Sequence, residues 1–160
     1  MHKDYIIRKI EQFVKALAAI VTARKAENYE ETVAMIQNAS KVYLETDISL
    51  LLTYTPDQVL EHFTDKSGNL DAERGVICAD LLYELALTFD AIHHQEESLQ
   101  IKVLCLNLYV TSILQNSQYR NELFFGKTLT LLDELKSHRL PGGIVEKLQD
   151  FQNFLDQQEA

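Results

Sequence analysis

Tryptophan is absent from this 160-residue sequence, and cysteine, proline and glycine are scarce, with 2 Cys, 2 Pro and 5 Gly. Two cysteines cannot form the disulfide framework that stabilises many small secreted domains. So little glycine and proline excludes a collagen-like chain and disfavours a β-sandwich, which needs a turn roughly every 8–12 residues. These absences leave an all-α fold as the leading prediction.

Basic residues are also in the minority, because 15 Lys and Arg stand against 24 Asp and Glu, a formal net charge of −9 with neutral His. A nucleic-acid-binding surface needs cations to neutralise phosphates, so we expect no nucleic-acid partner. No apolar run approaches the roughly 18–20 residues of a membrane span, and Arg8, Lys9 and Glu11 interrupt any signal-peptide core. We therefore expect no membrane partner.

The two cysteines, Cys78 and Cys105, are each flanked by apolar residues. Free cysteine in such a setting behaves as a small buried hydrophobic residue, which is typical of a reducing compartment. We expect a cytoplasmic protein in which both thiols are structural and no cofactor is bound.

Apolar residues recur at helical spacing along most of the chain, and no segment alternates with the period of a strand. Asn28, Asp47 and Thr55 each stand where a side chain could cap the next helix. The sequence predicts a single domain, residues 1–160, with an N-terminal part at 1–63 and a C-terminal part at 70–160. Long helices are expected over about 4–24, 29–44, 71–92, 96–114, 123–135 and 144–155, and short ones near 48–52 and 56–63.

One segment resembles a tetratricopeptide repeat. It carries Leu85, Ala86 and Phe89, then the turn 93–95, and then the small residues Ser98 and Cys105. In that family, large and small residues of a first helix pack against small residues of a second. A weaker match covers 16–39, and a degenerate unit would lie between the two. The resemblance implies antiparallel helical hairpins stacked as a tetratricopeptide-like right-handed array, although Lys102 stands where the family usually has an aromatic residue.

The whole chain also resembles a family of small bacterial all-helical proteins with repeat-like hairpins, which open with a segment similar to Lys3-Asp4-Tyr5-Ile6. No activity is assigned to that family. This resemblance therefore implies a fold but no mechanism.

First helices of tetratricopeptide arrays line a concave groove, and the resemblance places five residues of this chain there: Asp80, Tyr83, Glu84, Leu87 and Asp90. Such a groove would be acidic and aromatic, and would suit a basic or amphipathic helical segment. We therefore expect a non-enzymatic protein-interaction or regulatory module whose protein or peptide partner is unknown. The simpler interpretation of the same residues is a solvated helix face.

A second hypothesis is a metal-dependent enzyme or metal-binding protein that uses Asp90, His93 and His94. Asp90 and His93 are three residues apart, which can place both side chains on one helix face. A two-metal site would need a second Asp/Glu-x-x-His pair, and the sequence contains none. We predict that the cluster is a polar turn without a metal.

A third hypothesis is a self-associating structural protein that dimerises through its first helix. On a helical wheel the apolar arc of this helix covers roughly 220°, more than one neighbour usually buries. Candidate interface residues are Ile7, Val14 and Val21. Another part of the fold or a membrane surface could cover this arc instead, although an interfacial helix would favour a more basic chain.

Overall fold

This computed structural model describes the backbone of residues 2–116 and 124–159, and the side chains of 8–116 and 124–158. These ranges are all-helical and contain no strand, although Thr64 and Leu70 form an isolated bridge. The prediction of six long and two short helices is confirmed. The helices are α1 (His2–Lys25), α2 (Tyr29–Leu44), α3 (Ile48–Leu51), α4 (Pro56–His62), α5 (Ala72–Ala91), α6 (Gln95–Gln115), α7 (Phe124–Leu135) and α8 (Gly142–Glu159).

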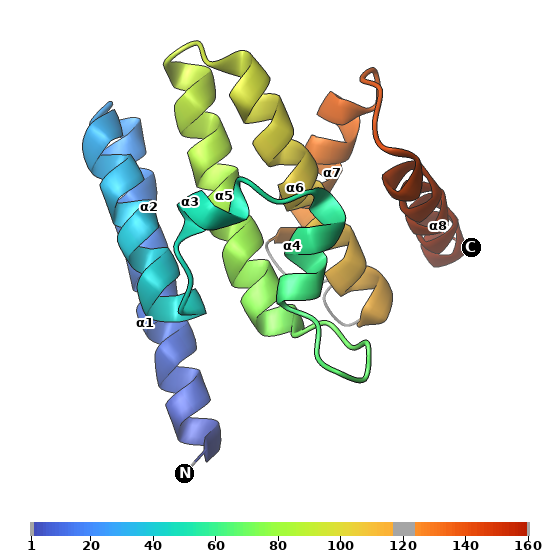
Figure 1. Cartoon of the computed structure of the whole chain (residues 1–160), viewed down its shortest axis with the longest axis horizontal. Helices are drawn as coiled ribbons and strands as arrows, with labels where there is room; N and C mark the ends of the chain where they lie inside the picture. The colour runs from blue at the N-terminus through green and yellow to red at the C-terminus, as the bar shows by residue number, and fades with distance from the viewer. Residues whose placement is uncertain (1, 117–123, 160) are drawn as a thin grey trace.

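Consecutive long helices pack as neighbours, α1 beside α2 and α5 beside α6 (Figure 1). Helix α5 also contacts α1 and α2, whereas α6 contacts α4, α7 and α8. The short helices α3 and α4 lie across the front of the molecule, and the N-terminal end of α1 extends beyond the other helices (Figure 1). The α5–α6 pair therefore joins the two ends of the fold.

Side-chain caps fix where several helices begin. Asp47 accepts a hydrogen bond from the Ser49 backbone N–H at 2.9 Å, at the start of α3. Thr55 and Gln58 form a reciprocal capping box at α4, with bonds of 3.2 and 2.9 Å. Both caps satisfy N–H groups that a first helical turn leaves unpaired, and both match the prediction.

The predicted cap at Asn28 is wrong. Asn28 precedes α2, but its side chain makes no cap hydrogen bond. Its backbone lies at φ −88° and ψ 69°, whereas the capping Thr55 is extended at ψ 162°. A capping residue normally has an extended backbone, and Asn28 departs from that conformation.

The core centres on α6, which contacts other helices on several sides. Its buried residues include Leu106, Leu108, Tyr109 and Ile113, which lose essentially all contact with solvent. Tyr109 stacks on Phe124 of α7 with ring centroids 5.2 Å apart. Side chains on α6 are therefore placed to connect the two halves of the molecule.

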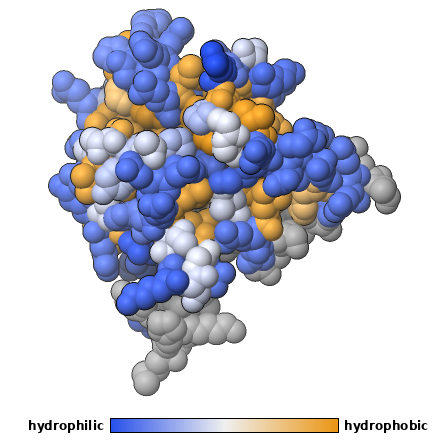
Figure 2. Space-filling model, turned by 45° about the vertical axis from the view of Figure 1, so that its right-hand side comes forward, coloured by the Kyte–Doolittle hydropathy of each residue, from blue (hydrophilic) through white to orange (hydrophobic). Residues whose placement is uncertain are grey.

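Apolar residues also reach the surface. Figure 2 turns the right-hand side of Figure 1 toward the viewer and shows apolar patches between polar side chains. None of the helices in the described ranges combines the length and apolar composition that crossing a membrane requires.

Candidate functional site

The three acidic residues predicted to line a groove all lie on α5, and each meets a cation from a different helix. Glu84 pairs with Arg24 of α1, Asp80 with Lys127 of α7, and Asp90 with Lys102 of α6. These contacts tie α5 to three neighbours. The acids of this face therefore have an internal structural role, which the sequence analysis did not predict.

Glu84 is the most deeply buried of these acids, with 3% of its surface exposed. Arg24 Nε donates to Glu84 Oε2 at 2.6 Å. A buried carboxylate is costly unless a cation or hydrogen-bond donors compensate its charge. Glu84 therefore does not present a free charge to a ligand, and its predicted place in an acidic groove is corrected.

Asp80 belongs to a largely buried polar cluster between α5, α6 and α7. Tyr109 donates a short hydrogen bond from its hydroxyl to Asp80 Oδ1, and Lys127 Nζ lies 3.4 Å from the same oxygen. Burial raises the pKa of Asp80 above its ordinary value, against the lowering effects of Lys127 and Tyr109. Asp80, like Glu84, is directed inward and is not an open groove residue.

Tyr83 and Leu87 are both half-buried on α5. The Lys127 ammonium lies over the Tyr83 ring, 5.2 Å from its centroid, in a cation–π contact. Lys127 therefore contacts both Asp80 and Tyr83, and the predicted aromatic surface is partly covered by this cation.

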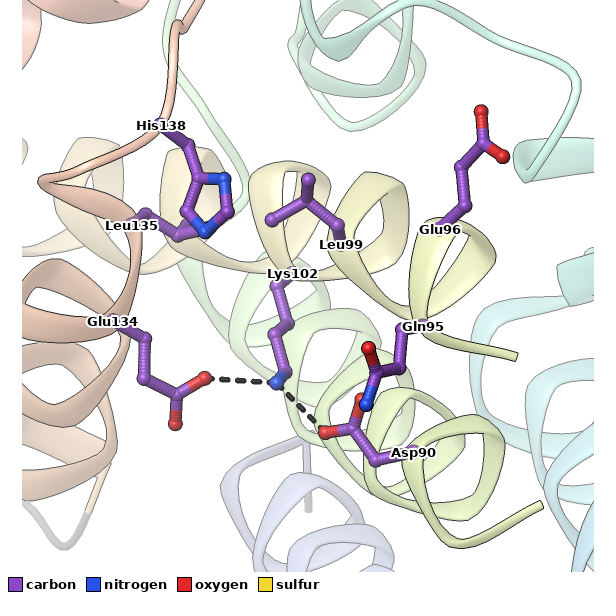
Figure 3. A pocket seen from close by; sticks show the side chains of 8 residues that line it. All are labelled: Asp90, Gln95, Glu96, Leu99, Lys102, Glu134, Leu135 and His138. Carbon is purple, nitrogen blue, oxygen red and sulfur yellow. Dashed lines mark hydrogen bonds and ion pairs between the residues drawn. The ribbon is translucent and has the colours of Figure 1, made fainter. Parts of the chain in front are cut away.

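Asp90 lies in a cleft of about 510 Å³, which we call the acidic cleft. Lys102 Nζ sits between two carboxylates and donates to Asp90 Oδ2 at 2.7 Å and to Glu134 Oε2 at 2.8 Å (Figure 3). Burial alone would lower the pKa of Lys102, but its bonds to Asp90 and Glu134 raise it overall. The lining residues come from α5, α6, α7 and the segment after α7: Asp90, Gln95, Glu96, Leu99, Lys102, Glu134, Leu135 and His138.

The acidic cleft keeps a negative surplus. Its lining includes three carboxylates, those of Asp90, Glu96 and Glu134, and one ammonium group, that of Lys102. The Glu96 carboxylate is directed away from Lys102 (Figure 3). Of the acidic groove predicted along α5, the part that remains accessible is therefore concentrated at this cleft.

Sequence reasoning placed Asp90 in the site but missed Glu134 and His138. Glu134 is 44 positions from Asp90 along the chain, and nothing local marks it as a neighbour. Lys102 did give an indication, because it departs from the aromatic residue of the tetratricopeptide pattern. A lysine at a packing position needs nearby carboxylates, and Asp90 and Glu134 provide them.

The structure does not bring the suggested metal ligands together. Asp90 is bonded to Lys102, while the exposed His94 ring stacks on Phe89 with centroids 6.0 Å apart. His93 is exposed and occupies the left-handed turn after α5, at φ 65°. Across residues 8–116 and 124–158, no three His, Cys, Asp or Glu side chains are grouped as a metal ion would require.

Both cysteines are buried free thiols. Burial raises the pKa of Cys78 and of Cys105, so both are protonated at neutral pH. Because a thiolate is the nucleophilic form of cysteine, neither thiol is placed for nucleophilic chemistry.

The first helix does expose apolar surface. Val14 is 58% exposed and Ile10 is 41% exposed. Val21, another of the three predicted interface residues, is half-buried. Ile7 lies within α1, but its side chain is outside the described residues.

Comparison with protein-family models, with curated protein sequences and with solved structures finds no match for this chain. The geometry of the acidic cleft and of the exposed apolar surfaces is therefore the basis on which a function can be proposed.

Proposed function

We propose that this chain is a non-enzymatic protein-interaction module of stacked helical hairpins, which binds a basic or amphipathic helical segment of another protein. The binding site is the acidic cleft. The observation that carries the proposal is an open cleft of about 510 Å³ whose lining holds three carboxylates and a single ammonium group. Complementary charge of this kind selects and orients a basic partner.

The lining of the acidic cleft suits a lysine or arginine side chain. Leu99, which is half-buried, provides apolar surface in the same cleft as the carboxylates of Glu96 and Glu134. Long basic side chains lay their aliphatic stems on apolar surface and keep the charge at a polar rim. A basic residue of the ligand would therefore contact both kinds of surface at once.

A tetratricopeptide-like arrangement of the hairpins belongs to the same proposal. Ser98 Oγ donates to the Ala86 carbonyl at 2.9 Å, and Cys105 Sγ donates to the Ala79 carbonyl at 3.2 Å. These small buried residues let α5 and α6 approach closely, as the repeat resemblance implies. They support the assignment of α5 and α6 as one repeat-like hairpin.

Reversing two charges of the cleft tests the proposed function. We expect the variant Glu96→Lys with Glu134→Lys to lose at least about tenfold of the partner protein captured from cell lysate, because attraction becomes repulsion. Quantitative mass spectrometry of the captured proteins measures this loss.

The matched control is Glu30→Lys with Glu31→Lys, which reverses two exposed charges in the first turn of α2. It changes the net charge by the same amount but leaves the cleft intact, so its capture should equal that of the unmodified chain. Equal capture by all three proteins would exclude the acidic cleft as the binding site.

Self-association is a second candidate function, favoured by the exposure of Ile10 and Val14 on α1. Apolar side chains this accessible on one helix can form the core of a dimer contact. We expect light scattering to give twice the monomer mass, and Val14→Glu to return the chain to a folded monomer. Val42→Glu, at a valine of α2 with similar exposure, is the control. A monomeric unmodified chain would contradict this candidate.

A further inference from the structure

A second hollow, of about 580 Å³, lies between α7 and α8. We call it the apolar groove. Helix α7 contributes Leu129 and Leu132, α8 contributes Val145 and Leu148, and Leu140 comes from the connection between them. Leu129 is 40% exposed and Val145 is 52% exposed. The two helices thus leave apolar side chains accessible along their facing sides.

The apolar groove adjoins the acidic cleft. Leu135 and His138, at and just beyond the C-terminal end of α7, line both hollows. A bound segment can therefore pass from one to the other without leaving the surface. Its apolar part would meet the leucines and valine of the groove, and its charged end would meet Glu134 and Asp90.

Because the two hollows adjoin, we infer that the apolar groove and the acidic cleft form one binding surface for an amphipathic helix of a partner protein, whose basic end occupies the cleft. The inference rests on the proposed function and specifies its ligand. Leu129 and Leu132 on α7, and Val145 and Leu148 on α8, are each three residues apart and so lie one helical turn apart. A ligand helix with apolar residues at the same spacing can lie between these two rows.

Charge favours such a partner over a second copy of this chain. A second copy of the chain carries the same formal net charge of −9, so it is a poor electrostatic complement to an acidic surface. The acidic cleft has two more negative than positive groups. A basic helix would reduce this negative surplus, whereas a second copy or an anionic membrane would increase it.

A defined peptide tests the inference. The probe is a fluorescein-labelled helix of about 18 residues, with leucines every three or four positions and lysines in its last turn. Fluorescence anisotropy measures its binding to the full chain. We expect Val145→Glu to weaken binding at least about tenfold, because it places a charge in the apolar groove. Val42→Glu changes a valine of similar exposure on α2 and should stay within about twofold of the unmodified chain.

The peptide provides its own controls. Replacing its leucines by serine, or its lysines by glutamate, should each weaken binding at least about tenfold. Equal binding by Val145→Glu and Val42→Glu would overturn the inference. In that case the proposed function would still be supported if charge reversal at Glu96 and Glu134 reduced the capture of a partner from lysate. The inference would also be overturned if the peptide did not bind the unmodified chain, or if the chain formed a dimer that Val145→Glu dissociates.

Discussion

Replacement of Phe151 by alanine is expected to lower the free energy of unfolding by about 3–5 kcal/mol, the usual cost of removing a fully buried aromatic side chain. Phe151 lies on α8 and is 0% exposed. Its ring is 6.3 Å from that of Phe125 on α7 and 6.1 Å from that of Phe154. Since α8 packs mainly on α6, loss of this side chain leaves a cavity beneath the last helix.

In the Phe151→Ala variant, the polar contacts between α8 and the rest of the chain should not compensate for the lost apolar packing. Lys147 Nζ donates to Asn107 Oδ1 at 2.7 Å, and Asn107 Nδ2 donates to the Pro56 carbonyl at 3.3 Å. Lys147 is half-buried, and burial lowers its pKa against the opposing charge of Asp57. This bond offsets part of the desolvation of Lys147, so it orients α8 more than it stabilises it.

Urea denaturation followed by circular dichroism measures the loss, and hydrogen exchange shows whether α8 opens before the other helices. The matched control is Phe154→Ala, which removes the same side chain from a half-buried position of the same helix. Its cost should be smaller, about 1–2 kcal/mol. Equal losses in the two variants would show that Phe151 is not the residue that anchors α8.

Local features of the fold could be predicted because the residues that determine them are close in sequence. A cap requires a side-chain oxygen and a backbone N–H two or three residues later, as at Asp47 and Thr55. The prediction failed at Asn28, which has a suitable side chain. There the preceding Glu27 is left-handed, at φ 63°, and the Asn28 backbone is not extended. Residue type alone therefore does not determine whether a cap forms.

Contacts of the candidate site could not be predicted, because they join distant parts of the chain. The resemblance to a tetratricopeptide repeat placed Asp80, Glu84 and Asp90 on one face of a helix, and all three do lie on α5. It could not show that Arg24, 60 positions before Glu84, would neutralise that acid. Likewise, Lys127 is 47 positions from Asp80. The pairing of these charges depends on how α1 and α7 pack against α5.

Replacement of Arg24 by alanine has the second large expected effect. It leaves the Glu84 carboxylate without its cation, although only 4% of that side chain is exposed. Removing one partner of a fully buried ion pair costs roughly 3–5 kcal/mol. Because 20% of the Arg24 side chain is exposed, water compensates part of this cost. We therefore expect a loss of about 2–3 kcal/mol in the free energy of unfolding.

An exposed ion pair of the same chain provides the comparison. Lys136 and Asp133 are 2.7 Å apart, but both side chains are largely exposed. Lys136→Ala should therefore leave the free energy of unfolding almost unchanged.

The double variant Arg24→Met with Glu84→Met tests whether the unpaired carboxylate of Glu84 causes this loss. It removes both charges and keeps apolar bulk between α1 and α5, so it should recover most of the stability lost in Arg24→Ala. Urea denaturation of the unmodified chain, Arg24→Ala, Lys136→Ala and the double variant measures these differences in the free energy of unfolding. If the double variant were no more stable than Arg24→Ala, the unpaired carboxylate of Glu84 would not be the cause of the loss.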